Sequence, residues 1–255
     1  MKRVTFFTAP KAFVGMFDVI QQNAINSWVS LCPKPEIILC GNDNGIANFA
    51  AEKKLLHVPD IKVSESGVPR LDDMFLRASD LASNDILVYT NCDMIFTQDI
   101  ILAIEKVDEK FPEEFLIVGQ RIDVAIPELI DFTKSNWEDN LRNQVAKTGK
   151  LHPVCGIDYF VFRKKSWRKF PPFIVGRIAW DNWFMGEALR RNHDVIDATT
   201  AIFAVHSNHD YSHAPTIANI RKCKDADLNR SLAREKPVFI NSANWKFINK
   251  EIKRK

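Results

Sequence analysis

Asp85-Ile-Leu-Val-Tyr-Thr-Asn-Cys-Asp-Met-Ile-Phe96 contains an apolar run that ends in polar side chains. Ile86–Tyr89 is typical of a buried strand, and Asn91 and Asp93 follow it directly. A strand that presents an Asn-x-Asp pair at its C-terminal end can offer a carboxylate to a metal ion or to a phosphate-bound cation. The alternative is a turn aspartate that hydrogen-bonds its own backbone.

Strands and helices alternate around this stretch. Further strands are expected at Val4–Thr8, Glu36–Cys40 and Phe115–Gly119, with amphipathic helices of about ten residues or more between them. This alternation predicts an α/β fold with a mostly parallel central sheet covered by helices on both faces. Ligands of such sheets bind at the carboxyl ends of the strands, so we expect the polar residues at three strand ends to converge: Thr8, Asn42, Asp43, Asn91 and Asp93.

The second half of the chain is less regular. Residues 121–150 carry many charges and predict a surface segment that partly covers the site. Residues 156–162 resemble a strand, and 179–191 predict a helix with Asp181 in its first turn. The last forty residues are polar and predict a helical extension. We therefore expect one main domain at 1–213 and a C-terminal helical extension at 214–255.

Composition excludes several classes of protein. A net charge of +3 is too weak to indicate nucleic-acid binding. No apolar stretch approaches the length of a membrane span. The five cysteines are odd in number and lack short paired spacings, which favours reduced thiols and a cytoplasmic location. The sequence contains neither a P-loop nor a Gly-x-Gly-x-x-Gly dinucleotide motif.

Asp181 is a candidate for acid–base chemistry because it lies between Trp180 and Trp183. Tryptophans beside a carboxylate can form a platform for a sugar face and raise the carboxylate's basicity by partial desolvation. The alternative is a helix-start aspartate stabilised by the helix dipole, with both tryptophans in the core.

His206, His209 and His213 fall within eight residues. Their spacing could suggest a zinc site, although the neighbouring Asn, Asp and Pro residues indicate a loop. We favour one histidine as a metal ligand, with the others contacting phosphate or backbone. Hydrogen-bonded loop histidines without a ligand are the alternative.

Two further positions could bind substrate. Asp158, before Tyr159, could bind an acceptor hydroxyl, or it could be a strand-edge aspartate in solvent. Arg70 precedes Asp72 and Asp73 at a predicted helix start and could touch a nucleotide. First-turn acids that stabilise the helix explain the two aspartates equally well.

Together these segments resemble glycosyltransferases of the GT-A fold, close to family 2-like bacterial sequences. The resemblance covers about residues 4–213 and rests on six segments in order: Thr8-Ala9-Pro10-Lys11, Ile37-Ile-Leu-Cys-Gly-Asn-Asp43, Tyr89-Thr-Asn-Cys-Asp93, Gly156-Ile-Asp-Tyr-Phe160, Pro171-Pro-Phe-Ile-Val-Gly-Arg-Ile-Ala-Trp-Asp-Asn-Trp183 and Val205-His-Ser-Asn-His-Asp-Tyr-Ser-His213. Tyr89–Asp93 looks like the family's Asp-x-Asp metal motif, with Asn91 in place of the first aspartate.

The resemblance implies a role for each matching residue. Asp93 and His206 would bind a divalent cation, Mn²⁺ or Mg²⁺, and Asp181 would be the general base of an inverting enzyme. Other residues would line the donor and acceptor sites: Thr8, Pro10, Asp43, Arg70 and Asn91 on the nucleotide side, and Asp158, Tyr159, Trp180, Trp183 and His209 on the sugar and acceptor side.

The function implied is metal-assisted transfer of a sugar from a nucleotide-sugar donor to a glycan or other hydroxyl acceptor. Three other functions remain open at this stage. A nucleotidyltransferase would use a similar sheet, but the sequence lacks a glycine-rich loop after the first strand. A sugar- or nucleotide-binding module could have kept the fold without turnover. A zinc hydrolase would use the histidine cluster.

Overall fold

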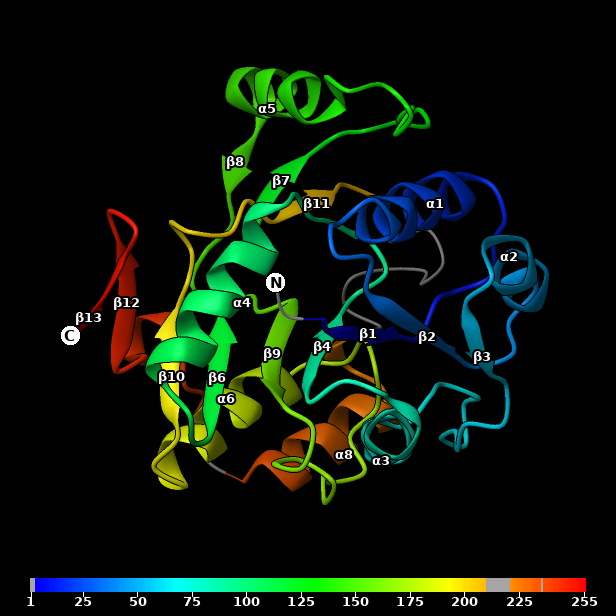
Figure 1. Cartoon of the computed structure of the whole chain (residues 1–255). Helices are drawn as coiled ribbons and strands as arrows, with labels where there is room; N and C mark the ends of the chain where they lie inside the picture. Colours follow the sequence, from blue (N-terminus) through cyan, green and yellow to red (C-terminus); the bar gives the residue numbers. More distant parts are fainter. Residues whose placement is uncertain (1–2, 210–220, 235) are drawn as a thin grey trace.

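The computed structural model describes residues 3–209, 221–234 and 236–255. Figure 1 shows a central sheet with helices packed against both of its faces and a smaller helical arm above it. Among the described residues, none of the helices combines the length and the hydropathy that a membrane crossing requires.

The main sheet has nine strands in the order β13-β12-β10-β6-β9-β4-β1-β2-β3. Their bounds are β1 Thr5–Thr8, β2 Glu36–Cys40, β3 Leu56–Val58, β4 Ile86–Thr90, β6 Phe115–Val118, β9 Tyr159–Arg163, β10 Asp194–Asp197, β12 Trp245–Ile248 and β13 Glu251–Arg254. Only β9 and β13 run antiparallel to their neighbours. The predicted mostly parallel sheet is therefore confirmed.

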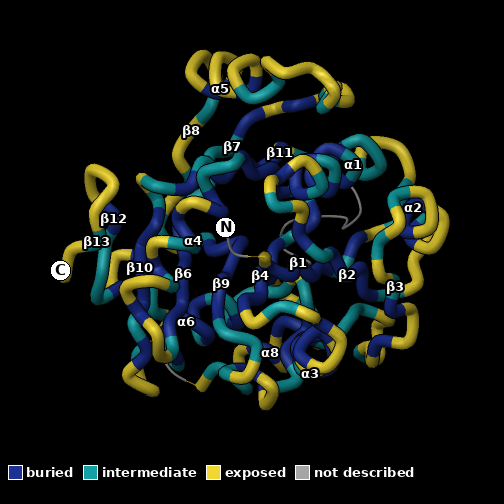
Figure 2. The backbone as a smooth tube through the Cα atoms, in the orientation of Figure 1, coloured by how far each residue is buried: buried dark blue, intermediate teal, exposed yellow. Residues whose placement is uncertain are grey.

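The central strands β1, β4 and β6 are buried along their whole length because both faces of the sheet are covered. In β1, Phe6 stacks on Trp28 at a ring-centroid distance of 5.4 Å, while Phe7 meets Phe75 edge-on at 5.1 Å. Successive side chains of a strand point to opposite faces, so these two contacts tie helices to both sides of the sheet. Figure 2 shows the resulting buried interior.

The helices divide between the two faces. Side chains of α1 (Met16–Val29), α2 (Ile46–Lys53) and α4 (Asp99–Lys110) belong to one core, and those of α3 (Leu71–Leu81) and α6 (Trp180–Arg190) belong to the other. The predicted helix that carries Asp181 in its first turn is therefore present as α6.

β9 fits between β4 and β6 and runs opposite to both. Its first residue, Tyr159, pairs with Thr90, the last residue of β4. The N-terminal end of β9 therefore lies at the carboxyl end of β4. This arrangement places Asp158 beside Asn91.

A second, four-stranded sheet lies beside the carboxyl ends of the central strands, in the order β5-β11-β7-β8. It consists of β5 (Met94–Ile95), β11 (Val205–Ser207), β7 (Ile122–Val124) and β8 (Lys150–Leu151). Between β7 and β8 the chain forms α5 (Trp137–Thr148), which stands away from the main sheet at the top of Figure 1. Residues 121–150, predicted to be an irregular surface segment, thus contain two strands and a helix.

The C-terminal region differs from the predicted helical extension. It contains α8 (Lys224–Ala233), a 3-10 turn at Ile240–Ser242, and the β12–β13 hairpin, which pairs with β10 and lengthens the main sheet. Phe247 of β12 is buried, and Trp245 Nε1 donates a 2.6 Å hydrogen bond to Asp194 Oδ1. The burial of Phe247 and the hydrogen bond of Trp245 hold the hairpin against the sheet. Of the predicted helical extension, only α8 is an α-helix among the described residues. The boundary predicted at residue 213 lies outside the described residues.

Candidate metal centre and active site

Three side chains converge just beyond the carboxyl end of β4. Asp93 Oδ2 lies 3.5 Å from His206 Nε2 and 3.3 Å from His209 Nε2. The small sheet creates this cluster, because His206 in β11 pairs with Met94 in β5 and Ser207 N donates a hydrogen bond to Asp93 O. One ligand atom from each of the three residues lies within 4.8 Å of the other two.

The charges within this cluster stabilise one another. Burial acts to raise the pKa of Asp93, but the positive charge of His206 and hydrogen bonds from both histidines hold it well below its ordinary value. Burial acts to lower the pKa of His206, but the Asp93 charge and hydrogen bonds to Asp123 and Asp93 raise it to about 9. The pair is therefore an ion pair at neutral pH when no cation replaces the imidazole proton.

The residues of the cluster suit a divalent cation. One carboxylate and two imidazoles are ligands that Mn²⁺ and related ions accept. Asp93 Oδ1 is buried and has no hydrogen-bond partner among the described residues. An unsatisfied buried carboxylate oxygen is costly, and a bound cation would remove that cost. Of the predicted ligands, Asp93 and His206 lie together, and His209 joins them.

A second layer of charged side chains surrounds the cluster. Asp123 Oδ1 lies 3.1 Å from His206 Nδ1 and 2.8 Å from Arg121 Nε, and Asp123 Oδ2 lies 2.6 Å from His152 Nδ1. Partners of this kind fix the orientation of a metal-binding imidazole and raise its basicity. Sequence reasoning missed Asp123, Arg121 and His152. The only local signal was the alternation of charged and apolar residues around Ile122.

Asn91 and Asp158 contact each other directly. Asn91 Nδ2 donates a 2.7 Å hydrogen bond to Asp158 Oδ1, and Arg121 Nη1 binds Asp158 Oδ2. Asp158 is buried, so the structure does not place it at a solvent-exposed strand edge. The network therefore links the carboxyl end of β4 and the start of β9 to Arg121, which also contacts Asp123 beside the Asp93–His206–His209 cluster.

Asp181 occupies the first turn of α6. Burial and the nearby Asp158 charge raise its pKa to about 7, although backbone N–H groups of Asn182, Asp181 and Ile157 donate hydrogen bonds to its carboxylate. Ala179, just before the helix, has a left-handed backbone, φ 83°, which sets the angle at which the helix begins. A carboxylate with a pKa near 7 is matched to general-base chemistry at neutral pH.

The aromatic candidates lie mainly in the core. Trp180 is 4% exposed and packs against Tyr89 and Phe160, each at a centroid distance of 5.3 Å. Tyr159 is fully buried. Trp183 retains partial exposure and packs against Phe170 and Phe173. This packing matches the alternative in which the tryptophans beside Asp181 belong to the core.

The predicted nucleotide-side residues occupy the ends of β1, β2 and the loop before α3. Thr8 and Pro10 are buried, and Asp43 is exposed beyond β2. Arg70 binds Asp72 through two hydrogen bonds of 2.7 and 3.1 Å at the start of α3. Within the described part of the chain, Asp43 and Arg70 form no hydrogen bond or ion pair with the metal cluster. His213 lies outside the described residues.

Comparison with known proteins identifies the fold. No protein-family model and no curated protein sequence matches the chain. Among solved structures, S. aureus TarS in complex with UDP-GlcNAc is 12% identical, with 85% of this chain and 62% of that chain covered and a TM-score of 0.50.

Two other solved structures have TM-scores slightly below that of TarS. A Pyrobaculum calidifontis mannosyltransferase in complex with GDP-Man and Mn²⁺ is 13% identical, covering 82% of this chain and 57% of that one at a TM-score of 0.49. Glucosyl-3-phosphoglycerate synthase from Mycobacterium tuberculosis in complex with Mn²⁺, UDP and phosphoglyceric acid is 14% identical. The match covers 83% of this chain and 73% of that chain at a TM-score of 0.48. The chain spans less than two thirds of the TarS and mannosyltransferase chains. The likeness to TarS confirms the predicted GT-A fold.

Proposed function

We propose that this protein transfers a sugar from a nucleotide-sugar donor to a hydroxyl group of an acceptor, assisted by a divalent cation. The observation that supports this function best is the Asp93–His206–His209 cluster at the carboxyl end of β4, with one buried oxygen of Asp93 unpaired. In α/β sheets this is the edge where ligands bind. TarS, which shares the fold, was crystallised with a nucleotide sugar of this class.

Asp93, His206 and His209 would hold the cation, and of the two predicted ions Mn²⁺ fits a donor set with two imidazoles better than Mg²⁺, which prefers oxygen ligands. When bound, the ion would offset the negative charge that develops on the leaving nucleoside diphosphate. Asp123 would keep the His206 ring in place through Nδ1, so that Nε2 faces the ion. Thr8, Pro10 and Asp43, with Arg70 and Asn91, would form the nucleotide side of the site.

Asp181 would act as the base. In the proposed reaction an acceptor hydroxyl oxygen forms a bond to the anomeric carbon as the bond to the diphosphate breaks. The hydroxyl proton moves to Asp181, and the bonding electron pair leaves with the nucleoside diphosphate. Attack from the face opposite the leaving group would invert the anomeric configuration. Asp158 and Trp183 would contact the transferred sugar. The five free cysteines favour the cytoplasm as the proposed location.

A thermal-shift screen tests the donor and the cation together. UDP- and GDP-sugars, each with and without Mn²⁺, are added to wild type, Asp93→Ala and the control Asp60→Ala. Asp60 is exposed and lies outside the cluster. A ligand that binds the native state raises the melting temperature. We expect a Mn²⁺-dependent rise in wild type and Asp60→Ala that is lost in Asp93→Ala.

Product analysis distinguishes the other candidate functions. Transfer releases a nucleoside diphosphate, whereas nucleotidyl transfer releases pyrophosphate, and a binding module gives a thermal shift without product. The proposal fails if no donor raises the melting temperature with Mn²⁺, or if Asp93→Ala keeps the full rise.

A further inference from the structure

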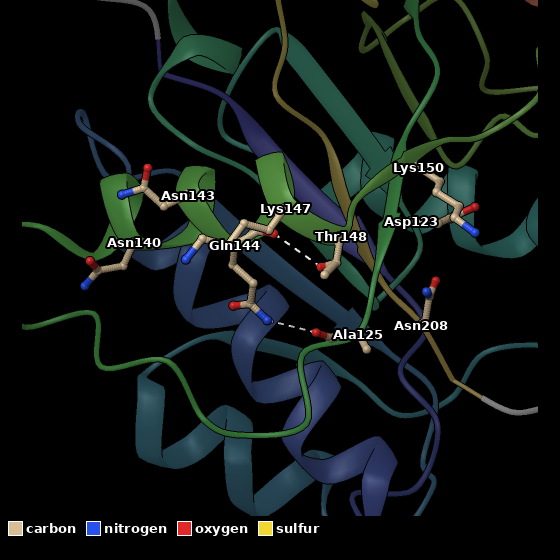
Figure 3. Close-up of a pocket in the computed structure, with 9 residues that line it drawn as sticks. All are labelled: Asp123, Ala125, Asn140, Asn143, Gln144, Lys147, Thr148, Lys150 and Asn208. Carbon is tan, nitrogen blue, oxygen red and sulfur yellow. Dashed lines mark hydrogen bonds between the residues drawn. The ribbon is translucent and has the colours of Figure 1, made fainter.

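A pocket of about 940 Å³, lined mostly by residues with polar side chains, lies between the α5 arm and the small sheet. Its volume is within the range of about 300–1,000 Å³ that is typical of small-molecule sites. Figure 3 shows side chains of α5 on one side of the pocket, with Asp123, Lys150 and Asn208 on the other. The pocket is therefore built mainly from the segment that the sequence predicted to be irregular.

The lining of the pocket is rich in amides and lysines. Four amide side chains line it, from Asn140, Asn143, Gln144 and Asn208. Of these, Gln144 donates a 2.9 Å hydrogen bond to Ala125 O, and the other three have no side-chain partner among the described residues. Amides can both donate and accept hydrogen bonds, which matches the hydroxyl groups of a sugar.

Two lysines give the pocket a positive charge. Neither Lys147 nor Lys150 has an ion-pair partner in the described part of the chain. The one acidic side chain of the lining, Asp123, is already bound by Arg121, His152 and His206. These partners offset the negative charge of Asp123. The ammonium groups of Lys147 and Lys150 therefore remain available to an anion.

The pocket adjoins the proposed reaction centre. Asp123 lines it and also contacts His206, while Asn208 lines it and directly precedes His209. The predicted nucleotide side lies at β1 and β2, whereas the pocket lies at β7, β8 and α5 (Figure 1). A molecule in the pocket would thus approach the metal ligands from a flank different from that of the nucleotide.

We propose that this pocket binds the acceptor, and that the acceptor is a hydroxyl-rich molecule bearing an anionic group, a phosphate or a carboxylate. The amides would bind its hydroxyls, and Lys147 and Lys150 would bind the anion. The assignment of the bound molecule as the acceptor rests on the proposed glycosyl transfer. The binding of an anionic sugar in the pocket can be measured without it.

The test is direct calorimetric binding without nucleotide or metal. The probes are four anionic sugars (glucose 6-phosphate, glucuronate, galactose 6-phosphate and galacturonate), the parent neutral sugars glucose and galactose, and inorganic phosphate. The proteins are wild type, the double variant Lys147→Gln/Lys150→Gln, and the matched control Lys165→Gln/Lys169→Gln. The control lysines are exposed and do not line the pocket.

We expect at least one anionic sugar to bind wild type and the control at least tenfold more tightly than both its neutral parent and inorganic phosphate. The Lys147/Lys150 variant should lose at least tenfold of that affinity. Comparison of the 6-phosphates with the uronates then shows which anion is preferred. The proposal is overturned if no anionic sugar exceeds its neutral parent, if inorganic phosphate binds as tightly as every sugar phosphate, or if both double variants bind alike.

Donor binding separates this inference from the proposed function. If nucleotide sugars shift the melting temperature but the pocket lysines do not affect sugar binding, only the acceptor assignment fails. If the lysines determine sugar binding but no nucleotide sugar binds, the pocket is an anionic-sugar site and the proposed glycosyl transfer fails. Where both hold, the Lys147/Lys150 variant should raise the KM for the anionic acceptor about tenfold and leave the KM for the donor unchanged.

Discussion

Asn91 Nδ2 donates a 2.7 Å hydrogen bond to Asp158 Oδ1. The contact gives the Asn91 amide, which stands at the first position of the Asn-x-Asp pair, a buried acceptor for its N–H. A carboxylate at position 91 would face the Asp158 carboxylate at hydrogen-bond distance, and two like charges there would repel each other. Asn91 thus connects the strand end that carries Asp93 to the start of β9.

Asn91→Asp should destabilise the protein at pH 8. The change replaces a donor with a second carboxylate against the buried Asp158, and we expect a loss of about 1–3 kcal/mol in the free energy of unfolding. Urea unfolding measures this loss. The exchanged pair Asn91→Asp/Asp158→Asn restores a donor opposite an acceptor but removes the Arg121–Asp158 ion pair, so it should recover only part of the loss. A single variant as stable as wild type would show that the contact contributes nothing.

Asp123→Asn should weaken Mn²⁺ binding by about 10- to 100-fold, because the His206 ring loses the negative charge that lies 3.1 Å from its Nδ1. Calorimetric titration of Mn²⁺ measures the effect, with Asp60→Asn as the control for removal of one exposed negative charge. Equal affinity in the two variants would mean that Asp123 does not orient the ligand.

The rate of transfer should depend on the ionisation of Asp181. Its pKa of about 7 means that the carboxylate is mostly protonated below that pH and cannot accept a proton. We therefore expect the rate at saturating substrate to rise with pH and to level off above about 7. Asp181→Asn should lower kcat by about 10²- to 10⁴-fold while leaving donor affinity unchanged. Full activity in this variant would remove Asp181 from the role of base.

Because of the raised pKa of Asp181, we also expect the free energy of unfolding to depend on pH. Because the folded state raises the pKa of Asp181 from 3.8 to about 7, its stabilising contribution is complete below pH 3.8 and is lost as the pH rises through 7. The amide that replaces the carboxyl group in Asp181→Asn cannot ionise, so this variant should gain about 1–3 kcal/mol relative to wild type between pH 4 and pH 8. Unfolding curves at both pH values measure the difference, and a change of the opposite sign would contradict the pKa shift.

Phe247→Ala should test the C-terminal hairpin. Phe247 is 2% exposed in β12, and truncation of a buried phenylalanine costs about 3–5 kcal/mol. The next residue, Ile248, is 40% exposed, so Ile248→Ala is the matched control with an expected loss below about 1 kcal/mol. If both variants melted at the wild-type temperature, the hairpin would not stabilise the sheet.

The parts of the fold that follow from local pattern were predictable. The apolar runs of β2 and β4 are continuous, and α6 shows apolar residues at helical spacing around Asp181. By contrast, α5 carries only a narrow apolar stripe, Trp137, Leu141 and Val145 at four-residue spacing, which is a weak helix signal among so many polar residues. The antiparallel direction of β9 depends on long-range pairing with β4 and β6, which no local pattern encodes.

The candidate site shows the same division. Asp93, Asp181 and His206 stand out because each follows or begins a recognisable element. Asp123 and His152 do not, because charged residues in a polar stretch resemble an ordinary solvated surface until β7 pairs with β11. Their contacts to the metal cluster are a product of topology, and only the structure shows them.

That topology also determines when the cluster can exist. His209 meets Asp93 across 116 residues of chain, and this contact requires β11 to pair with β5 and β7 in the small sheet. Closing so long a loop is slow and entropically costly. A partly folded chain in which β11 is unpaired offers an ion the single carboxylate of Asp93. A cation held by the cluster as proposed would bind tightly only to the completed fold, and it would stabilise that state increasingly as its concentration rises.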